Sequence, residues 1–512
     1  MLVNVYSAAI YEIDAYPIRI EVNLDRGIGY HLVGLPDKAV SESSYRISAA
    51  LQNSGYKMPH NKLIINMAPA DLRKEGSAYD LPIALGILAA SDQIKDDKLQ
   101  DYWFMGELSL DGSLRPVRGA LPVALKAKED GLKGVILPFE NRDEAAIVDG
   151  IEVYGMKNIR DVIDFLEGRS SPEPYRLDME KLFYDELDRF EHDFADVKGQ
   201  ESVKRALEIA AAGGHNVLMV GPPGSGKTML AKRLPGILPP MTLEEALETT
   251  KIHSVAGVLK SSRGIVTKRP FRSPHHTISD VALVGGGSYP QPGEISLAHN
   301  GVLFLDELPE FKRSVLEVLR QPLEDREVTI SRAKFTVTYP AGFMLIASMN
   351  PSPSGYFNDP NSPLRSSPAE MQRYLSKISG PLLDRIDLQI EVEPVPFEEL
   401  SDSRRGESSA EIRKRVIRAR EIQTERYRDY PGIHYNAQLS SKLIRKFCAV
   451  DEASLQLLKN AMDKLNLSAR AYDRILKVAR TIADLDESQD IKSHHLAEAI
   501  QYRSLDRQGW FG

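Results

Sequence analysis

The chain has 512 residues, with 65 Lys and Arg against 72 Asp and Glu, which gives a formal net charge of −7. At about 150 residues a domain, this length predicts about three domains. The composition, 42% hydrophobic and 27% charged, is that of an ordinary globular protein and excludes wholesale disorder. The single cysteine, Cys448, excludes an intramolecular disulfide framework and any metal site that needs two thiolates. The mild acidity argues against a uniformly basic nucleic-acid binder but is compatible with a local basic surface.

Neither a targeting signal nor a membrane-spanning helix is predicted. The N-terminal residues lack the basic start and the apolar core of a signal peptide. The most apolar run, Leu81 to Ala90, is about half as long as the roughly 20 residues that a helix needs to cross a bilayer. We therefore expect a cytoplasmic protein without a membrane partner.

The first block of the chain, residues 1–167, mixes strands and helices. Partly alternating, β-branched residues predict strands at Val3–Ile10, Ile18–Leu24 and Leu63–Met67. Helices are expected at Ala39–Asn53 and Leu81–Ala90, so this block is α/β or α+β. Residues 168–193 open with Gly168-Arg-Ser-Ser-Pro-Glu-Pro174, whose composition is typical of a linker.

The second block, residues 194–397, alternates short apolar strands with helical stretches, as nucleotide-binding parallel sheets do. Its predicted strands are Asn216–Val220, Gly301–Leu305 and Phe343–Ser348. The third block, residues 398–512, is predicted to be helical throughout. After a first helix from about Glu411, helices are expected at Ser440–Cys448, Glu452–Leu465, Ala469–Leu485 and Lys492–Arg503.

The first helix of the third block is rich in arginine. Its arginines are Arg413, Arg415, Arg418, Arg420, Arg426 and Arg428. Because Glu411, Glu421 and Glu425 lie on the same stretch, we expect a solvated helix face with paired charges rather than a binding surface.

A phosphate-binding loop is the strongest motif of the chain. Gly221-Pro-Pro-Gly-Ser-Gly-Lys-Thr228 fits G-x-x-x-x-G-K-[ST] at every fixed position, between an apolar strand and a helix from Lys227 to Leu234. In such a loop the glycines let backbone N–H groups turn toward the phosphates. We predict that Gly221, Pro222, Pro223, Gly224, Ser225, Gly226, Lys227 and Thr228 bind the nucleotide. Lys227 would reach the β- and γ-phosphates, and the Thr228 hydroxyl would bind Mg²⁺.

Two further motifs place polar groups at strand ends. Gly301-Val-Leu-Phe-Leu-Asp-Glu307 is an apolar strand that ends in two acids. Asp306 would hold Mg²⁺, and Glu307 would polarise the attacking water. The strand of Phe343-Met-Leu-Ile-Ala-Ser-Met-Asn350 ends in an amide that can orient water beside the γ-phosphate, although such an asparagine is more often a turn former.

The chain that carries these motifs resembles the magnesium-chelatase-related ComM/YifB family of AAA+ ATPases over nearly its whole length. Further matching segments are Asp196-Val-Lys-Gly-Gln200, Lys204–Asn216, Phe271-Arg-Ser-Pro-His-His-Thr277, Pro292–His299 and Ser379-Gly-Pro-Leu-Leu-Asp-Arg-Ile-Asp387. The resemblance implies an α/β protein with a Lon-protease-like α+β domain over residues 1–167. It also implies an AAA+ core over residues 194–397, a C-terminal helical lid over residues 398–512, and ATP and Mg²⁺ as cofactors.

The resemblance also assigns roles to single residues. Asn350 matches the sensor 1 position, and Arg470, in Ser-Ala-Arg-Ala-Tyr-Asp-Arg474, matches the sensor 2 arginine of the lid. Arg385 matches the arginine finger that reaches the ATP of a neighbouring subunit, although an exposed ion pair with Asp384 or Asp387 is the alternative. A finger supplied in trans implies a ring, and the family's usual hexamer would supply it.

A predicted β-hairpin, Glu327–Tyr339, resembles the pore hairpin of MCM helicases and carries Arg332 and Lys334 at its turn. Basic residues also gather upstream, at Lys260, Arg263, Lys268, Arg269 and Arg272. We expect these residues to neutralise DNA phosphates in the pore; a solvated charged hairpin is the alternative. His275 and His276 are adjacent without a nearby cysteine, so a structural or DNA-facing role is favoured over metal binding.

At two places the sequence lacks residues that related proteins use, first for zinc binding and then for peptidase activity. Family members with a zinc-type cysteine cluster carry it at the positions of Ser352, Ser354, Leu364 and Ser366, and without thiolates we expect no zinc there. The segments Lys74–Pro82 and Gly106–Pro116 resemble the Lon-protease-like domain, but its catalytic serine corresponds to Ala78, and its lysine falls near Ala120–Pro122, where no lysine is present. We therefore expect no peptidase activity.

The leading functional prediction is an ATP-driven, hexameric DNA motor for branch migration in recombination or natural transformation. The alternative is a protein or cofactor remodeller that resembles the magnesium-chelatase motor subunit. A non-hydrolysing scaffold is disfavoured, because Lys227, Asp306, Glu307, Asn350 and Arg385 form a complete set.

Overall fold

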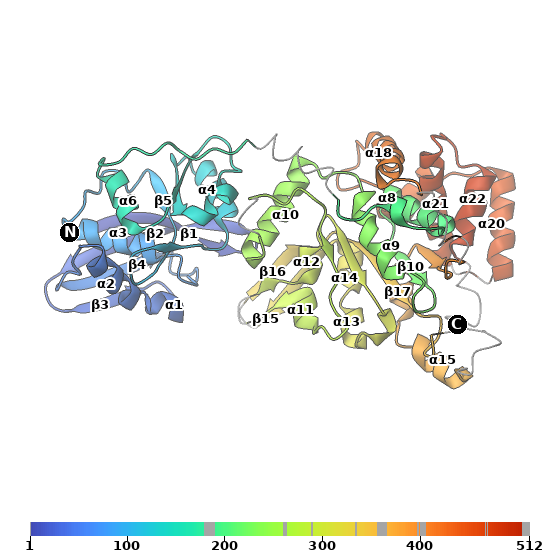
Figure 1. The fold of residues 1–512 in the computed structure, drawn as a ribbon, viewed down its shortest axis with the longest axis horizontal. Helices are drawn as coiled ribbons and strands as arrows, with labels where there is room; N and C mark the ends of the chain where they lie inside the picture. Colours follow the sequence, from blue (N-terminus) through green and yellow to red (C-terminus); the bar gives the residue numbers. More distant parts are fainter. Residues whose placement is uncertain are drawn as a thin grey trace. The chain divides into compact units, whose positions relative to one another are not determined.

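The computed structural model describes residues 2–178, 190–259, 264–287, 290–332, 335–355, 366–396, 399, 406–465, 467 and 469–503 (Figure 1). Two compact units divide the chain. The first comprises residues 1–186 and 243–267, and the second comprises residues 187–242 and 268–512. Residues 243–267, which the sequence analysis assigned to the ATPase block, thus pack with the N-terminal residues.

The first unit is built on a mixed seven-stranded sheet in the order β3-β4-β2-β1-β5-β8-β9. Its strands are β1 (Leu2–Tyr11), β2 (Asp14–Asp25), β3 (Gly29–Val33), β4 (Lys62–Ala68), β5 (Tyr102–Phe104), β8 (Gly134–Pro138) and β9 (Glu152–Met156). The pairs β1–β2 and β2–β4 are antiparallel, while the remaining neighbours are parallel. A small ladder of β6 (Glu107–Leu108) and β7 (Leu114–Arg115) lies beside it. The three strands predicted for this block are confirmed.

The helices of the first unit are α1 (Lys38–Ser41), α2 (Ser43–Asn53), α3 (Asp80–Ala90), α4 (Ala120–Glu129), α5 (Arg142–Ala145), α6 (Ile159–Leu166) and α10 (Leu243–Ala256). The helix predicted over Ala39–Asn53 is divided at Glu42. All eleven residues of α3 are buried: its apolar residues lie on every side, and the carboxylate of Asp80 pairs with Arg46 at 2.7 Å. Among the described helices none has both the length and the apolar character that a bilayer crossing requires.

The second unit contains a parallel five-stranded sheet in the order β11-β14-β17-β10-β18. Its strands are β10 (Val217–Val220), β11 (Phe271–Arg272), β14 (Val302–Leu305), β17 (Met344–Met349) and β18 (Leu388–Glu391). The three central strands are buried along their whole length, as continuous apolar runs in parallel sheets are. Since all carboxyl ends meet at one edge, the loops after β10, β14 and β17 are brought together there.

Helices and two small hairpins surround this sheet. The helices are α8 (Glu201–Gly213), α9 (Lys227–Arg233), α11 (Asp280–Val284), α12 (Glu294–Leu297), α13 (Arg313–Glu317), α14 (Arg320–Asp325), α15 (Pro368–Leu375) and α16 (Gly380–Leu383). One hairpin pairs β12 (Gly285–Gly286) with β13 (Gln291–Pro292). The other pairs β15 (Glu327–Arg332) with β16 (Phe335–Pro340), which confirms the predicted hairpin.

The C-terminal part is helical, as predicted. Its helices are α18 (Ser409–Arg426), α19 (Ser441–Phe447), α20 (Glu452–Leu465), α21 (Ala469–Leu485) and α22 (Ser493–Gln501). In this region Arg428 pairs with Glu425 as predicted. The other arginine pairings differ: Arg415 pairs with Glu208 and Glu407, Arg418 with Glu487, and Arg426 with Asp484. The arginine-rich helix therefore packs on α8 and α21 through its charges instead of carrying only a solvated face.

Candidate nucleotide-binding site

The loop Gly221–Thr228 joins β10 to α9 at the carboxyl edge of the parallel sheet. Gly224 and Gly226 have φ angles of 79° and 92°, in the left-handed region that favours glycine. The Ser225 hydroxyl is buried with no hydrogen-bond partner among the described residues. This backbone leaves room for N–H groups to face an anion, as the sequence motif predicts.

Lys227 and Asn350 lie together in this site. The Lys227 amine donates hydrogen bonds to the carbonyls of Gly221 and Pro222 at 2.6 and 2.9 Å, and to Oδ1 of Asn350 at 3.3 Å. Burial lowers the pKa of Lys227, while the carboxylates of Asp306 and Glu307 act in the opposite direction. The carbonyl of Asn350 accepts a hydrogen bond from the Tyr374 hydroxyl at 3.1 Å. The amine is thus held where two strand ends meet.

Thr228 and Asp306, which the sequence predicts as magnesium ligands, lie side by side. The Thr228 hydroxyl donates to Asp306 Oδ2 at 2.7 Å. The other carboxylate oxygen of Asp306 accepts the Ser348 hydroxyl and, at 3.1 Å, the backbone N–H of Glu307. A hydroxyl and a carboxylate side by side are oxygen donors of the kind that Mg²⁺ prefers, so the residues fit this ion. Ser348 was not predicted to take part, because a lone serine inside an apolar strand carries no motif.

Glu307 lies beside Asp306 but makes a contact that the sequence did not reveal. Its backbone is in the left-handed region, with φ of 56°. Its Oε2 is 3.5 Å from Nδ1 of His276. His275, by contrast, contacts Thr277, with 2.9 Å between Nδ1 and the hydroxyl. The two adjacent histidines therefore differ in surroundings, and only one of them touches a predicted catalytic residue among the described contacts.

Arg385 is held within its own chain by the acid Glu324 and by the carbonyl of Pro381, to which it donates at 2.8 Å. Its described contacts do not include the loop Gly221–Thr228. The backbone of Arg470 lies in α21, and its side chain falls outside the described residues. A residue one turn further along the helix, Arg474, donates to Asp387 at 2.8 Å.

Asp387 anchors a buried network between the sheet and the lid helices. Besides Arg474, it contacts Nδ1 of His215 at 3.0 Å, and Nε2 of the same ring contacts the Thr481 hydroxyl at 2.8 Å. Burial by itself would raise the pKa of Asp387, but Arg474 and His215 outweigh it and hold this pKa below its usual range. The sequence motif around Arg385 contains Asp387, but it did not predict that Asp387 contacts Arg474 and His215.

The predicted DNA-facing residues have mixed surroundings. Arg269 donates to the carbonyls of Pro239 and Asn300 at 2.6 and 2.8 Å, and Arg272 forms a two-bond pair with Glu294. Internal contacts thus occupy these two guanidinium groups, which corrects the expectation that both face DNA. Lys268 lies 5.5 Å from the ring centre of Phe190. Lys260, Arg263, Lys334 and the side chain of Arg332 fall outside the described residues.

Three of the four positions at which the sequence analysis expects no zinc cluster, Ser352, Ser354 and Ser366, lie close together. The Ser352 and Ser354 hydroxyls are 2.9 Å apart, and Ser366 donates to Ser354 at 3.2 Å. Leu364 falls outside the described residues. Hydrogen bonds between neutral hydroxyls join these positions, and the metal-free loop stays a prediction.

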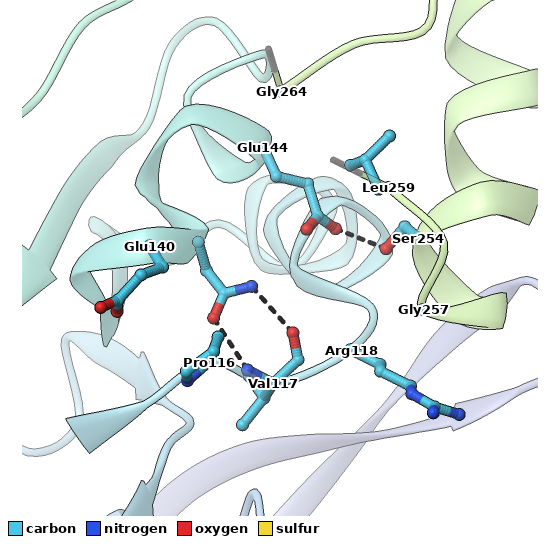
Figure 2. Close-up of a pocket in the computed structure, with 10 residues that line it drawn as sticks. Pro116, Val117, Arg118, Glu140, Glu144, Ser254, Gly257, Leu259 and Gly264 are labelled. Carbon is cyan, nitrogen blue, oxygen red and sulfur yellow. Dashed lines mark hydrogen bonds between the residues drawn. The ribbon is translucent and has the colours of Figure 1, made fainter. Parts of the chain in front are cut away.

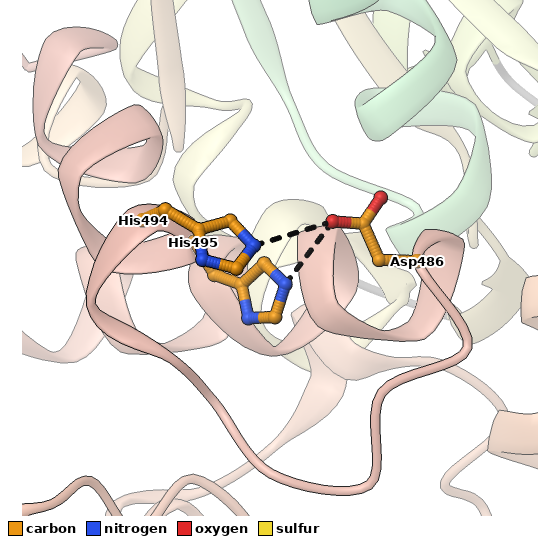
Figure 3. A group of neighbouring side chains, drawn as sticks. All are labelled: Asp486, His494 and His495. Atoms are coloured by element: carbon orange, nitrogen blue, oxygen red, sulfur yellow. Dashed lines mark hydrogen bonds and ion pairs between the residues drawn. The ribbon is translucent and has the colours of Figure 1, made fainter.

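Another cluster, of Asp486, His494 and His495, could by position hold a metal ion (Figure 3). Nε2 of His495 is 3.1 Å from Asp486, and Nε2 of His494 is 3.7 Å from it. However, Nδ1 of His495 accepts the backbone N–H of Lys492 at 2.9 Å. A neutral His495 then carries its proton on Nε2, which leaves no lone pair for a metal there. The geometry favours a helix cap over a metal site.

In the first unit, a cavity of about 540 Å³ lies between the loop before α4 and the residues that follow α10 (Figure 2). The buried carboxylate of Glu144 accepts the backbone N–H of Leu121 at 2.7 Å and the hydroxyl of Ser254. Lys251 of α10, the helix that also carries Ser254, pairs with Asp14 at 2.7 Å. These contacts hold α10 in the first unit. Ala78 and the residues Ala120–Pro122 bring no hydroxyl and no amine to this unit.

Comparison with known proteins places the chain in a family. A family model described as magnesium chelatase, subunit ChlI, matches residues 193–400. A second model, described as subunit ChlI of Mg-chelatase, matches residues 20–141. A model of the ChlI C-terminal region matches residues 406–503. The chain is 47% identical to the competence protein ComM of Haemophilus influenzae, over 99% of this chain and 98% of that protein. It is 46% identical to the uncharacterized protein YifB of Escherichia coli, over 98% and 97% of the two chains.

The chain belongs to the magnesium-chelatase-related ComM/YifB family. It is also 27% identical to Lon protease 2 of Bacillus subtilis over 161 residues, which cover 31% of this chain and 29% of that protein. This similarity concerns the N-terminal region. The fold is accordingly α/β, with a Lon-like N-terminal region, an AAA+ P-loop region with a parallel sheet, and a helical C-terminal region.

Proposed function

We propose that this protein is an ATP-driven DNA motor that works as a homo-hexamer in recombination or competence. The observation that carries the proposal is the convergence of Lys227 with Asn350 and of Thr228 with Asp306 at one edge of the sheet. The similarity to ComM over nearly the full length of both chains supports a role in competence. The hairpin of β15 and β16, which precedes β17 and the adjoining Asn350, supports DNA as the substrate.

In the proposed reaction, backbone N–H groups of Gly221–Thr228 bind the phosphates of ATP. Lys227 exchanges its contacts with backbone carbonyls for the β- and γ-phosphates. Thr228 and Asp306 would hold Mg²⁺, and this ion would neutralise phosphate charge when bound. This loop thus supplies binding and charge neutralisation.

The residues at the strand ends act on the attacking water. Glu307 accepts its proton, and Asn350 orients it. Arg385 leaves Glu324 and neutralises charge on the ATP of a neighbouring subunit, while Arg470 contacts the nucleotide from the lid. Hydrolysis in successive subunits then moves the hairpins along the DNA strand.

The second candidate function is remodelling of a protein or a cofactor complex. The matches to models of the magnesium-chelatase subunit ChlI favour it, since they cover all three regions of the chain. The two candidates differ in the ligand that stimulates ATP hydrolysis: DNA for the motor, and a protein or cofactor complex for the remodeller.

ATPase rates with no DNA and with single-stranded, duplex and branched DNA separate these functions. A DNA motor should respond with at least a several-fold rise, and Lys227→Ala should remain inactive under every condition. A wild-type rate that no DNA changes would favour the remodeller.

The hairpin turn provides a second test. Arg332→Glu combined with Lys334→Glu should abolish DNA stimulation and leave the basal ATPase intact, because the pore would lose phosphate-neutralising charge. The same charge reversal at the exposed Lys442 and Arg445 of α19 is the control. Unchanged stimulation in the hairpin variant would contradict DNA binding at this turn.

A further inference from the structure

Arg326 closes the base of the β15–β16 hairpin, since it is the single residue between α14 and β15. Its backbone N–H donates to the carbonyl of Pro322 at 3.0 Å and ends α14, and its carbonyl accepts the N–H of Ala341 at 2.8 Å. Its φ is 60°, in the left-handed region that favours glycine. A strained arginine persists only where its surroundings hold it, so the contacts of this side chain fix the hairpin base.

The Arg326 side chain reaches the helical C-terminal region. Its guanidinium lies 5.1 Å from the ring centre of Tyr435, and its Nη1 donates to the Tyr435 hydroxyl. Gly342, between β16 and β17, leaves space for the guanidinium, because a Cβ there would come within 2.6 Å of Nη2 of Arg326. A hydrogen bond from a cation and a cation–π interaction thus join the hairpin base to one aromatic ring.

Tyr435 is fixed in turn to α21 and to the turn that follows α8. The next residue, Asn436, is buried and donates to the Thr481 hydroxyl and to Asp484 of α21, both at 2.9 Å. Gly214 ends α8 with a φ of 68°, and a Cβ at this position would overlap the Tyr435 ring. Since β10 and the phosphate loop follow this turn, the ring lies where the hairpin base, α21 and the start of β10 meet.

A second guanidinium, that of Arg420 in α18, also lies near this ring, at 4.5 Å from its centre. Arg420 donates to the carbonyls of Ala211 and Ala212 at 2.8 and 3.1 Å, and so holds α18 on the end of α8. The two cations therefore attach Tyr435 to different elements. Removal of the Arg326 side chain frees the hairpin base but leaves Arg420 to keep the ring in place.

We propose that Arg326 and Tyr435 form a joint through which closure of the C-terminal helices over ATP moves the β15–β16 hairpin. The inference rests on the proposed function, which takes these helices as the lid and the hairpin as the DNA contact. When bound nucleotide draws α21 toward the phosphate loop, Tyr435 moves with α21, and Arg326 passes the displacement to β15. The described contacts of both residues lie outside the loop Gly221–Thr228, so both are positioning residues.

The first measurement needs no DNA. Hydrogen–deuterium exchange of the full chain follows the amides of β15 and β16 without nucleotide and with Mg²⁺ and a non-hydrolysable ATP analogue. In the wild type the analogue should change the exchange rates of these amides at least about threefold. In Tyr435→Leu and in Arg326→Gln the hairpin should lose most of this response. The amides of Gly221–Thr228 should keep their protection in every variant, which shows that the analogue is still bound.

The variants include a matched tyrosine. Tyr430 is half-buried in the same connection between α18 and α19, and its hydroxyl also accepts from a cation, the amine of Lys446. Tyr430→Leu should therefore leave the hairpin response intact. The double variant of Tyr435→Leu and Arg326→Gln should behave like either single variant, because the two side chains act as one contact. If a thermal melt shows that Tyr435→Leu does not fold, Tyr435→Phe and Arg326→Gln decide.

The second measurement is thermodynamic. The Kd of a fluorescent single-stranded DNA is determined without nucleotide and with the same ATP analogue. The ratio of the two values should differ from one by at least about threefold in the wild type and approach one in Tyr435→Leu, since it measures the coupling of the two sites. The Kd without nucleotide should stay within about twofold of the wild type, which separates lost coupling from lost DNA binding.

The outcomes distinguish the joint from the function on which it rests. A hairpin that does not respond to the ATP analogue in the wild type, or that responds equally in Arg326→Gln, would overturn the joint. An equal loss of response in Tyr430→Leu would overturn this route in particular. If the wild type binds no DNA, the DNA-motor function fails, whereas a hairpin response that depends on Arg326 and Tyr435 would still support the joint.

Discussion

Ser348 decides how firmly Asp306, the proposed magnesium ligand, is held. Its hydroxyl donates to one oxygen of Asp306 and lies 3.4 Å from the backbone nitrogen of Glu307, while the other oxygen faces Thr228. Residues that orient a metal ligand commonly change metal affinity by about 10- to 100-fold when removed. Ser348 therefore supports both Asp306 and Glu307.

Ser348→Ala should raise the Mg²⁺ concentration for half-maximal ATPase by about tenfold, since Asp306 would lose a donor that fixes its orientation. Titration of the ATPase with Mg²⁺ at saturating ATP measures the change. Ser352→Ala, just beyond the same strand, is the control and should leave the titration unchanged. An equal shift in both variants would contradict this role of Ser348.

Lys477 introduces a pH dependence into the lid. Burial lowers the pKa of this amine to about 8, although Asp387 acts against the shift, and the amine donates to the carbonyl of Ala437 at 3.0 Å. In the unfolded chain a lysine keeps its proton to about pH 10.4. Between these pH values the unfolded state binds more protons, so the free energy of unfolding rises with pH.

Urea unfolding at pH 7.5 and pH 10 should show this rise, of about 1 to 3 kcal/mol, in the wild-type protein. Lys477→Met should reduce it, because the variant has no amine to deprotonate at this position. Lys492→Met offers a matched lysine control at the start of α22. Identical pH dependence in Lys477→Met and the wild type would show that this amine is not the source.

At the scale of elements, strong local patterns were sufficient to predict most of the fold. The apolar run before the phosphate loop predicted Asn216–Val220, and the structure has β10 over Val217–Val220. The expected helix over Ala39–Asn53 is broken at Glu42, where the adjacent Ser43 and Ser44 are weak helix formers. The site motifs predicted Lys227, Thr228 and Asp306 beside each other, whereas Ser348 and His276 come close only through strand order.

The pair of Arg385 and Glu324 joins the residues that follow α16 to α14 and restrains the proposed arginine finger. The Arg385 side chain is 20% exposed and that of Glu324 is 65% exposed, so solvent weakens the pair. To reach a neighbouring subunit, Arg385 must break this contact. If Arg385 is the proposed finger, breaking this pair is part of the free-energy cost of each catalytic cycle.

Glu324→Gln should raise the ATPase kcat by about twofold to fivefold, in line with the small free energy of an exposed ion pair. Steady-state kinetics at a fixed protein concentration measure it. The control is Glu317→Gln, which disturbs the pair of Glu317 with Arg320 instead. A fall in kcat for Glu324→Gln, with no fall for Glu317→Gln, would contradict this prediction and would mean that Glu324 positions Arg385 for catalysis.

At the scale of the whole molecule, one segment packs away from its neighbours in the sequence. Residues 243–267 leave the ATPase block and join the N-terminal unit, where Ser254 and Lys251 hold α10 to Glu144 and Asp14. No sequence motif marks this excursion, because α10 has ordinary helix composition and its partners lie more than 100 residues away. Residues 243–267 are thus physically part of the Lon-like unit, although they lie after the phosphate loop in the sequence.

Subunit mixing tests the proposed ring most directly. If Arg385 acts in trans, Lys227→Ala and Arg385→Ala inactivate different halves of one interfacial site. Each variant alone should be inactive, but an equal mixture should regain activity, because in a random ring about a quarter of the interfaces combine an intact Lys227 with an intact Arg385. ATPase measurements across mixing ratios, with co-assembly followed by differently tagged subunits, would record the recovery. Co-assembled mixtures that stay inactive at every ratio would place Arg385 outside the neighbouring site and remove the main reason for a ring.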